Sequence, residues 1–168
     1  MPGNLRGRLD DLVLETPVQG MPALSERLGV DIRLKREDLQ PVFSFKLRGA
    51  YAKLLSLDAD ERARGVICAS AGNHAQGVAL AANHLGIEAT VVMPAITPEI
   101  KVNAVEKQGA RVVIHGDDFD AACVQALEIA ERENLTFVHP YDDPEVITGQ
   151  ATIAMELFRQ CHVSPDYL

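Results

Sequence analysis

Residues 65–93 read GVICASAGNHAQGVALAANHLGIEATVVM, and the fold class follows from this stretch. The run 65–69 (GVICA) predicts a buried strand, and the run 89–93 (ATVVM) predicts a second one. Between them, residues 73–85 predict a helix that Gly86 closes. A strand, a helix and a strand in this order form a βαβ unit, whose two strands lie parallel in one sheet.

The same alternation extends in both directions. Downstream, we expect a helix over 97–108, a strand over 110–115, a helix over 117–134, a strand over 135–139 and a helix over 143–160. Upstream, we expect a short helix over 21–28, a strand over 31–35 and a helix over 45–55. Strands rich in Val and Ile that alternate with long helices indicate an α/β protein, with an open parallel sheet and helices on both of its faces.

Composition and charge argue against several classes of function. The 168 residues carry a formal net charge of −8, which repels nucleic-acid phosphates on average. We find neither an apolar run of about eighteen residues nor an apolar N-terminal segment, so we expect no membrane contact, no signal peptide and a cytoplasmic location. The three cysteines and five histidines have no metal-ligand spacing, so we predict no metal site.

The lysine in Ser44-Phe45-Lys46-Leu47-Arg48-Gly49-Ala50 falls at the start of a predicted helix. The positive field of a helix N-terminus, together with partial burial, lowers the pKa of an ammonium group and favours the free amine. A free amine can form a Schiff base or act as a base. Taken alone this signal is weak, because most lysines at helix starts are simply solvated.

A second segment, Ser70-Ala71-Gly72-Asn73-His74-Ala75-Gln76-Gly77, lies where a buried strand ends and a helix begins. Ligands bind at this edge of an open parallel sheet, and small residues let the backbone N–H groups approach a carboxylate or a phosphate. The alternative is an ordinary helix cap, with Ser70 or Asn73 as the capping residue. The segment matches neither a P-loop nor the GxGxxG pattern of dinucleotide-binding proteins.

Together the two segments resemble a known family. Residues 35–51 (KREDLQPVFSFKLRGAY) are similar to the cofactor-lysine signature of threonine dehydratases, also called threonine ammonia-lyases. Residues 70–77 are similar to the substrate-carboxylate loop of these enzymes. The similarity continues through Val91-Val92-Met93-Pro94, Ile100-Lys101, His115-Gly116 and Gly149-Gln150.

The resemblance places the chain among fold type II, tryptophan-synthase-like enzymes that use pyridoxal 5'-phosphate (PLP). Residues 40–43 (QPVF) are more similar to the biosynthetic enzymes of the isoleucine pathway. Catabolic dehydratases and serine racemases usually carry a Thr-Gly pair before the Ser-Phe-Lys. The implied reaction converts L-threonine to 2-oxobutanoate and ammonia, and L-serine to pyruvate by the same path. A serine dehydratase, a serine racemase and a non-catalytic fragment of such an enzyme remain as alternatives.

The resemblance also implies a role for each matching residue. Lys46 would bind PLP covalently, Asn73 would hydrogen-bond the 3-oxygen of the cofactor, and Phe45 would pack near the pyridine ring. The substrate carboxylate would be bound by backbone amides of Ser70, Ala71, Gly72, Asn73 and His74.

Two expectations concern charged residues. Arg48 is expected either near the cofactor or in a surface ion pair. Residues 36–38 (RED) form a charge run, which is typical of a solvated or salt-bridged face.

The implied architecture has two domains. Residues 1–50 would begin the large PLP domain, 51–142 would form the small α/β domain, and 143–168 would start the return to the large domain. The glycine-rich loop for the PLP phosphate and the serine for the pyridine nitrogen would follow residue 168. We therefore expect the chain alone to bind PLP weakly and to be weakly active, and the full-length enzyme to self-associate.

Overall fold

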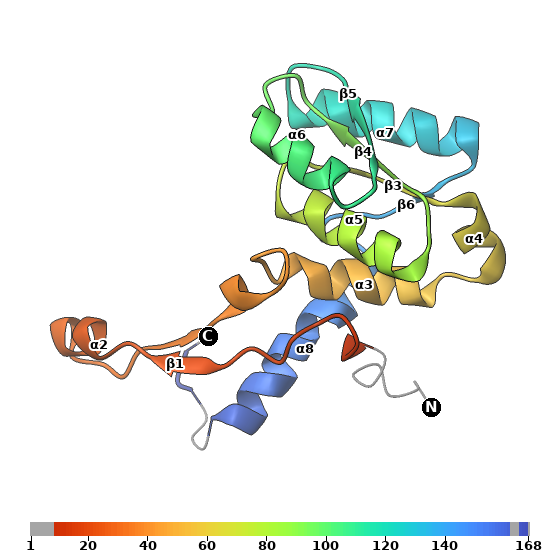
Figure 1. The fold of residues 1–168 in the computed structure, drawn as a ribbon. Helices are drawn as coiled ribbons and strands as arrows, with labels where there is room; N and C mark the ends of the chain where they lie inside the picture. Colours follow the sequence, from red (N-terminus) through yellow and green to blue (C-terminus); the bar gives the residue numbers. More distant parts are fainter. Residues whose placement is uncertain (1–8, 162–164, 168) are drawn as a thin grey trace.

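The computed structural model describes residues 9–161 and 165–167 and contains a sheet of four parallel strands in the order β5-β4-β3-β6 (Figure 1). The strands are β3 (Val66–Ala69), β4 (Ala89–Met93), β5 (Arg111–Ile114) and β6 (Thr136–Phe137). Val66 pairs with Ala89 on one side and with Thr136 on the other. The predicted α/β class with an open parallel sheet is confirmed.

Helices cover both faces of this sheet. Helices α5 (Asn73–Leu85) and α6 (Glu99–Glu106) lie on one face, and α7 (Phe119–Glu133) lies on the other. Side chains of β3 alternate accordingly, because Cys68 packs in the core that contains α5 whereas Ile67 packs against Ala122 of α7. Burial on both faces explains why the strands read as continuous apolar runs.

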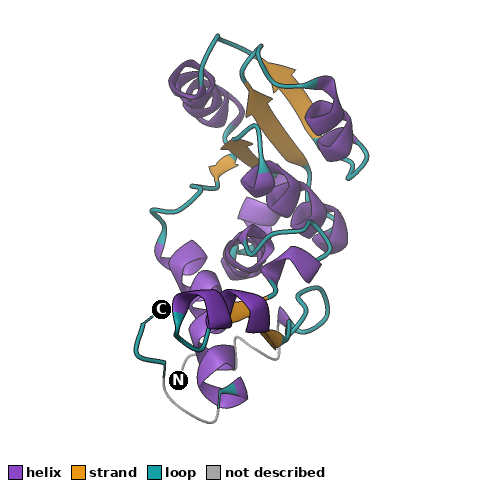
Figure 2. Ribbon diagram, turned by 90° about the vertical axis from the view of Figure 1, so that its left-hand side faces the viewer, coloured by secondary structure: helices purple, strands orange, loops and turns teal. Residues whose placement is uncertain are grey.

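A second layer lies beside the sheet unit. Helix α3 (Lys46–Ser56) lies between α5 and α8 (Pro144–Gln160), as Figure 1 shows. Strands β1 (Val18–Gly20) and β2 (Arg33–Lys35) form an antiparallel pair around helix α2 (Pro22–Leu28). The 3-10 turn η1 (Glu37–Leu39) leads toward α3. Figure 2 shows the β1–β2 pair at the end of the molecule opposite the four-stranded sheet.

The elements expected from the sequence are all present, with ends that differ by a few residues. Strand β6 is shorter than the predicted 135–139, because it pairs only with the first two residues of β3 at the edge of the sheet. Helix α4 (Ala59–Arg64) was not predicted, although Asp58 and Glu61 form a complete capping box at its start. Helix α3 runs through the predicted domain boundary at residue 50, and the division into domains stays a prediction.

The crossing of α3 and α8 depends on two glycines. A Cβ atom added to Gly149 would lie 2.5 Å from the carbonyl oxygen of Arg48 and 2.7 Å from the Cα atom of Gly49. A Cβ atom added to Gly49 would lie 2.8 Å from the carbonyl oxygen of Val146. Both residues are helical, so what the crossing requires is space and not an unusual backbone conformation. The two backbones therefore touch where the helices cross.

We expect Gly149→Ala to lower the free energy of unfolding by roughly 1–3 kcal/mol, because the added methyl group must push two helix backbones apart. Urea unfolding followed by circular dichroism measures this change. Gly20→Ala is the matched control, since nothing lies within 4 Å of a Cβ atom at that position. Equal effects of the two substitutions would contradict the packing argument.

Candidate active site

Lys46 is the first residue of α3, and its amine has a neutral partner. The Nζ atom donates a hydrogen bond to the carbonyl oxygen of Pro140 at 2.7 Å and lies 5.5 Å from the centroid of the Phe45 ring. No carboxylate in the described part of the chain forms an ion pair with Lys46. Burial lowers the pKa of Lys46 below its ordinary value. The amine is therefore easier to deprotonate than that of a solvated lysine.

The loop that follows β3 offers unpaired backbone amides. Helix α5 begins after Gly72, and no side chain caps it, so neither Ser70 nor Asn73 is the capping residue. The amides of Ala71, Asn73 and His74 have no acceptor among residues 9–161 and 165–167. Such amides attract an anion at a helix N-terminus.

Two of the five predicted carboxylate-binding amides already have acceptors. The amide of Ser70 donates to the carbonyl oxygen of Val92 at 3.1 Å, which extends the strand pairing by one residue. The amide of Gly72 donates to Ser70 Oγ at 3.1 Å. The structure thus leaves Ala71, Asn73 and His74 as the free donors of the predicted set.

Gly77 brings the lysine helix and this loop together. A Cβ atom on Gly77 would lie 3.2 Å from the carbonyl carbon and oxygen of Lys46 and from the amide nitrogen of Leu47. Helix α5 therefore rests on the first peptide bond of α3. The two motifs that the sequence singled out therefore lie side by side at the carboxyl edge of the sheet, where ligands bind in open α/β folds.

The predicted site side chains differ in exposure. Asn73 and Phe45 are both exposed, and the ring of Phe45 lies beside the amine of Lys46. The side chain of His74 is instead buried, and its Nε2 atom lies 3.0 Å from the carbonyl oxygen of Val138. Because a carbonyl oxygen only accepts, Nε2 carries the proton, and the buried Nδ1 atom has no partner in the described part of the chain.

His74 is neutral near pH 7. Burial lowers the pKa of its imidazole to about 4; the bond to Val138 opposes this effect, and the nearby Lys46 and His139 add to it. A neutral imidazole with one fixed tautomer is suited to hold a carbonyl group in place.

Arg48 lies neither beside Lys46's amine nor at the surface. Its side chain is 1% exposed, and its guanidinium contacts Glu37 at 2.8 Å and Glu156 at 2.6 Å. Lys35 pairs with the same Glu156 at 2.6 Å. The expectation of a surface ion pair is wrong, because the buried Glu156 and the partly buried Glu37 compensate the buried guanidinium.

The charge run 36–38 divides between surface and interior. Arg36 and Asp38 form an exposed ion pair, as predicted for a salt-bridged face. Glu37 points inward to Arg48. Burial alone would raise the pKa of Glu37, but hydrogen bonds from Arg48 and Thr16 and the charge of Arg48 lower it below its ordinary value.

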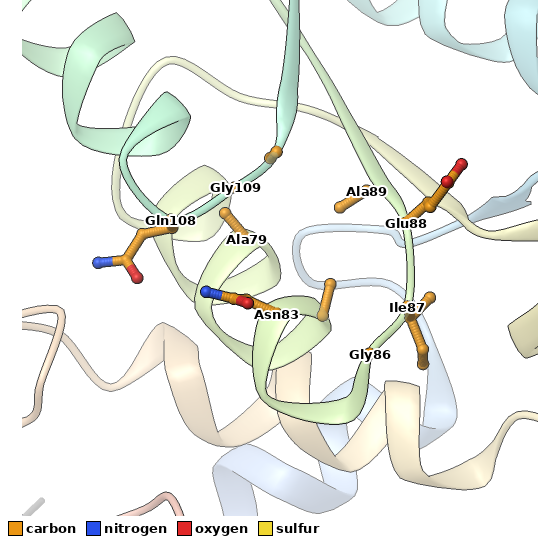
Figure 3. A pocket seen from close by; sticks show the side chains of 10 residues that line it. Ala79, Asn83, Gly86, Ile87, Glu88, Ala89, Gln108 and Gly109 are labelled. Carbon is orange, nitrogen blue, oxygen red and sulfur yellow. The ribbon is translucent and has the colours of Figure 1, made fainter.

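A shallow pocket opens on the opposite edge of the sheet (Figure 3). It lies between the end of α5 and the segments that lead into β4 and β5. Figure 3 shows Asn83, Glu88 and Gln108 around it. None of the predicted site residues lines this pocket.

Within the part of the chain that the structure describes, two kinds of feature are absent. No group of three or more His, Cys, Asp or Glu side chains is placed to bind a metal ion. No helix has both the length and the apolar character needed to cross a membrane.

Comparison with known proteins gives the family. Residues 9–168 match the family model described as pyridoxal-phosphate dependent enzyme. The chain belongs to this family. The biosynthetic L-threonine dehydratase IlvA of Pasteurella multocida is 56% identical over 156 residues, which are 93% of this chain and 30% of that protein.

Solved structures agree with this membership. The processed form of threonine deaminase isoform 2 from Solanum lycopersicum has a TM-score of 0.90 and 49% identity, covering 94% of this chain and 44% of that one. Maize serine racemase has a TM-score of 0.88 and 31% identity, covering 93% and 47%. The chain spans less than a third of the Pasteurella relative and less than half of these two structures.

We expect Glu37→Gln to lower the free energy of unfolding at pH 7 by roughly 3 kcal/mol, because a buried guanidinium loses one of its charged partners. The folded-state pKa of Glu37 is lowered, so its stabilisation is present above the ordinary value of 4.5 and is lost as the pH falls through the lowered value. Urea unfolding at several pH values should show the two proteins converge in acid.

Asp38→Asn is the matched control, because Asp38 lies next in sequence but pairs with Arg36 at the surface. Its effect on the free energy of unfolding should be much smaller than that of Glu37→Gln, because an exposed ion pair is screened by solvent. A difference between wild type and Glu37→Gln that is the same at pH 7 and pH 3 would contradict the role of the carboxylate charge.

Proposed function

We propose that this chain carries the cofactor lysine and the substrate-carboxylate loop of a PLP-dependent threonine dehydratase. The reaction is the dehydration and deamination of L-threonine to 2-oxobutanoate and ammonia, as in isoleucine biosynthesis. One observation carries the proposal. The amine of Lys46 has a lowered pKa and no carboxylate partner among the described residues, and its helix touches α5, at whose start the free amides lie.

The residues present fit PLP. An amine of lowered pKa whose hydrogen-bond partner is a neutral carbonyl suits covalent attachment to the aldehyde of the cofactor. Phe45 lies beside that amine and supplies an aromatic face, and Asn73, at the start of α5, supplies a polar side chain that is exposed. Phe45 and Asn73 are proposed as ring and 3-oxygen contacts on the strength of the resemblance.

Each part of the site then has a task. Bound PLP would supply an electron sink for the electrons that remain when the substrate loses its α-proton. The free amides of Ala71, Asn73 and His74 would bind the substrate carboxylate and so fix the direction of the Cα–H bond. The Nζ atom of Lys46, as a free amine, would take the α-proton and become an ammonium.

A serine-directed enzyme is the second candidate. The fold of maize serine racemase matches with a TM-score of 0.88, but at 31% identity compared with 56% for the Pasteurella threonine dehydratase. The segment QPVF at 40–43 also favours the biosynthetic threonine enzymes. A cytoplasmic location and self-association of the full-length enzyme stay predictions.

We expect borohydride reduction in the presence of PLP to label Lys46 selectively. Its amine has a lowered pKa and pairs with no carboxylate of residues 9–161 or 165–167, whereas Lys35 and Lys53 form ion pairs with Glu156 and Asp143. Peptide mass spectrometry locates the phosphopyridoxyl group, and Lys46→Arg is the control that should abolish the label. Equal labelling of all lysines, or none, would contradict the proposed cofactor site.

Turnover of L-threonine and L-serine by the full-length protein separates the candidates. A threonine dehydratase should release 2-oxobutanoate faster than pyruvate, and a racemase should convert L-serine to D-serine. The 168-residue chain alone should be much less active. Full activity of this chain alone would contradict the expectation that cofactor-binding residues follow it, and absence of any product from the full-length protein would favour a non-catalytic role.

A further inference from the structure

The proposed function gives a role to the backbone amide of His74 but none to its buried imidazole. Its Nε2 atom donates to the carbonyl oxygen of Val138, the residue that follows strand β6. The amide of Val138 donates in turn to the carbonyl oxygen of Ile67 in β3 at 2.8 Å. Val138 is fully buried and is held on one side by the sheet and on the other by the first turn of α5.

The chain after Val138 is short and held along its length. The Nδ1 atom of His139 accepts hydrogen bonds from the amides of Tyr141 at 3.3 Å and Asp142 at 2.7 Å. Asp143 caps α8 and pairs with Lys53 at 2.7 Å. The carbonyl of Pro140, the acceptor for Lys46 Nζ, lies in the middle of this segment. Its position therefore depends on where Val138 is held.

We propose that His74 is a positioning residue for Lys46. Its Nε2–H group holds the carbonyl of Val138, and this bond places the Pro140 carbonyl where it accepts a hydrogen bond from the free amine of Lys46. The inference rests on the proposed function, in which Lys46 is the reacting lysine. The carbonyl then stabilises the ammonium that Lys46 becomes when its nitrogen takes the α-proton.

An acid-base role for His74 fits the geometry less well. Its Nε2 proton is donated to the carbonyl oxygen of Val138, and its buried Nδ1 atom has no partner among the residues that the structure describes. With a pKa of about 4, the imidazole has little tendency to accept a proton near neutral pH. His74 supplies one fixed hydrogen-bond donor, the Nε2–H group, to the carbonyl oxygen of Val138. The side-chain amide of a glutamine at this position has a similar reach and can also donate a hydrogen bond.

The surroundings of Lys46 make its pKa a direct readout. Burial is the cause that lowers this pKa, and His74 is a titratable group within electrostatic range of both Lys46 and His139. No carboxylate in the described ranges pairs with the amine. Loss of the Pro140 acceptor should therefore lower the pKa of Lys46 further, because the ammonium form loses its hydrogen bond.

The test compares His74→Leu, which removes the donor, with His74→Gln, which keeps a donor at similar reach. Competitive acetylation with acetic anhydride across a pH series, mapped by mass spectrometry, gives the pKa of each lysine in the full chain without cofactor. In His74→Leu the pKa of Lys46 should fall by about one pH unit, and in His74→Gln it should return to within a few tenths of wild type. Lys101 and Lys107, on and just after α6, should not change.

Either of two results would overturn the proposal. An unchanged pKa of Lys46 in a folded His74→Leu protein would mean that the bond to Val138 does not place the acceptor. A raised pKa would mean that water has entered and that His74 only fills space. If His74→Leu does not fold, the nitrogen-15 spectrum of wild-type His74 decides, since a proton on Nδ1 in place of Nε2 also overturns the proposal.

The readout is independent of the proposed function. It needs neither PLP nor substrate, so an unchanged pKa rejects the positioning role even where borohydride labels Lys46. Conversely, absence of labelling at Lys46 rejects the cofactor site even where His74→Leu shifts the lysine pKa.

Discussion

The close contact of α3 with helices on both sides sets where Lys46 lies. Gly77 brings α5 against the first peptide bond of α3, and Gly149 brings α8 against Gly49. Any larger side chain at these positions would separate the backbones and move the lysine with its helix. Because well-packed helices cannot yield without loss of contacts, these glycines determine the position of the amine relative to the amide loop and to Pro140.

The ion pairs of the buried Arg48 fix how the packed helices are oriented relative to one another. Apolar contacts alone let a helix slide or rotate at little cost, whereas each hydrogen bond of Arg48 is satisfied only in one arrangement. Arg48 joins α3 to Glu37 of η1 and to Glu156 of α8, and Lys35 of β2 joins the same carboxylate. Burying these groups is expensive, so the network specifies the arrangement of four elements more than it stabilises them.

Hydrophobic periodicity was sufficient to predict the sheet and its helices. Buried strands such as Val66–Ala69 are short and apolar on both faces, and Gly86 marks the end of α5 by a left-handed cap. The resemblance indicated Lys46 and the loop after β3. The Pro140 acceptor was not predictable, because a backbone carbonyl has no signature in the sequence. The burial of Arg48 was equally hidden, since Glu37 belongs to a run of charges that is typical of a surface.

The chain makes a left-handed turn at Phe43, three residues before Lys46. Phe43 has a left-handed backbone with φ of 57°, which costs an L-residue roughly 1–2 kcal/mol, and its ring is 77% exposed, so burial does not offset the strain. Its amide donates to the carbonyl of Gln40, whose buried side chain bonds both backbone groups of Leu14. By the resemblance of residues 35–51, Phe43 would stand where the catabolic enzymes usually carry the glycine of the Thr-Gly pair. A glycine and an exposed phenylalanine have only the backbone in common, so the requirement at this position is the turn that directs the chain into α3 at Lys46.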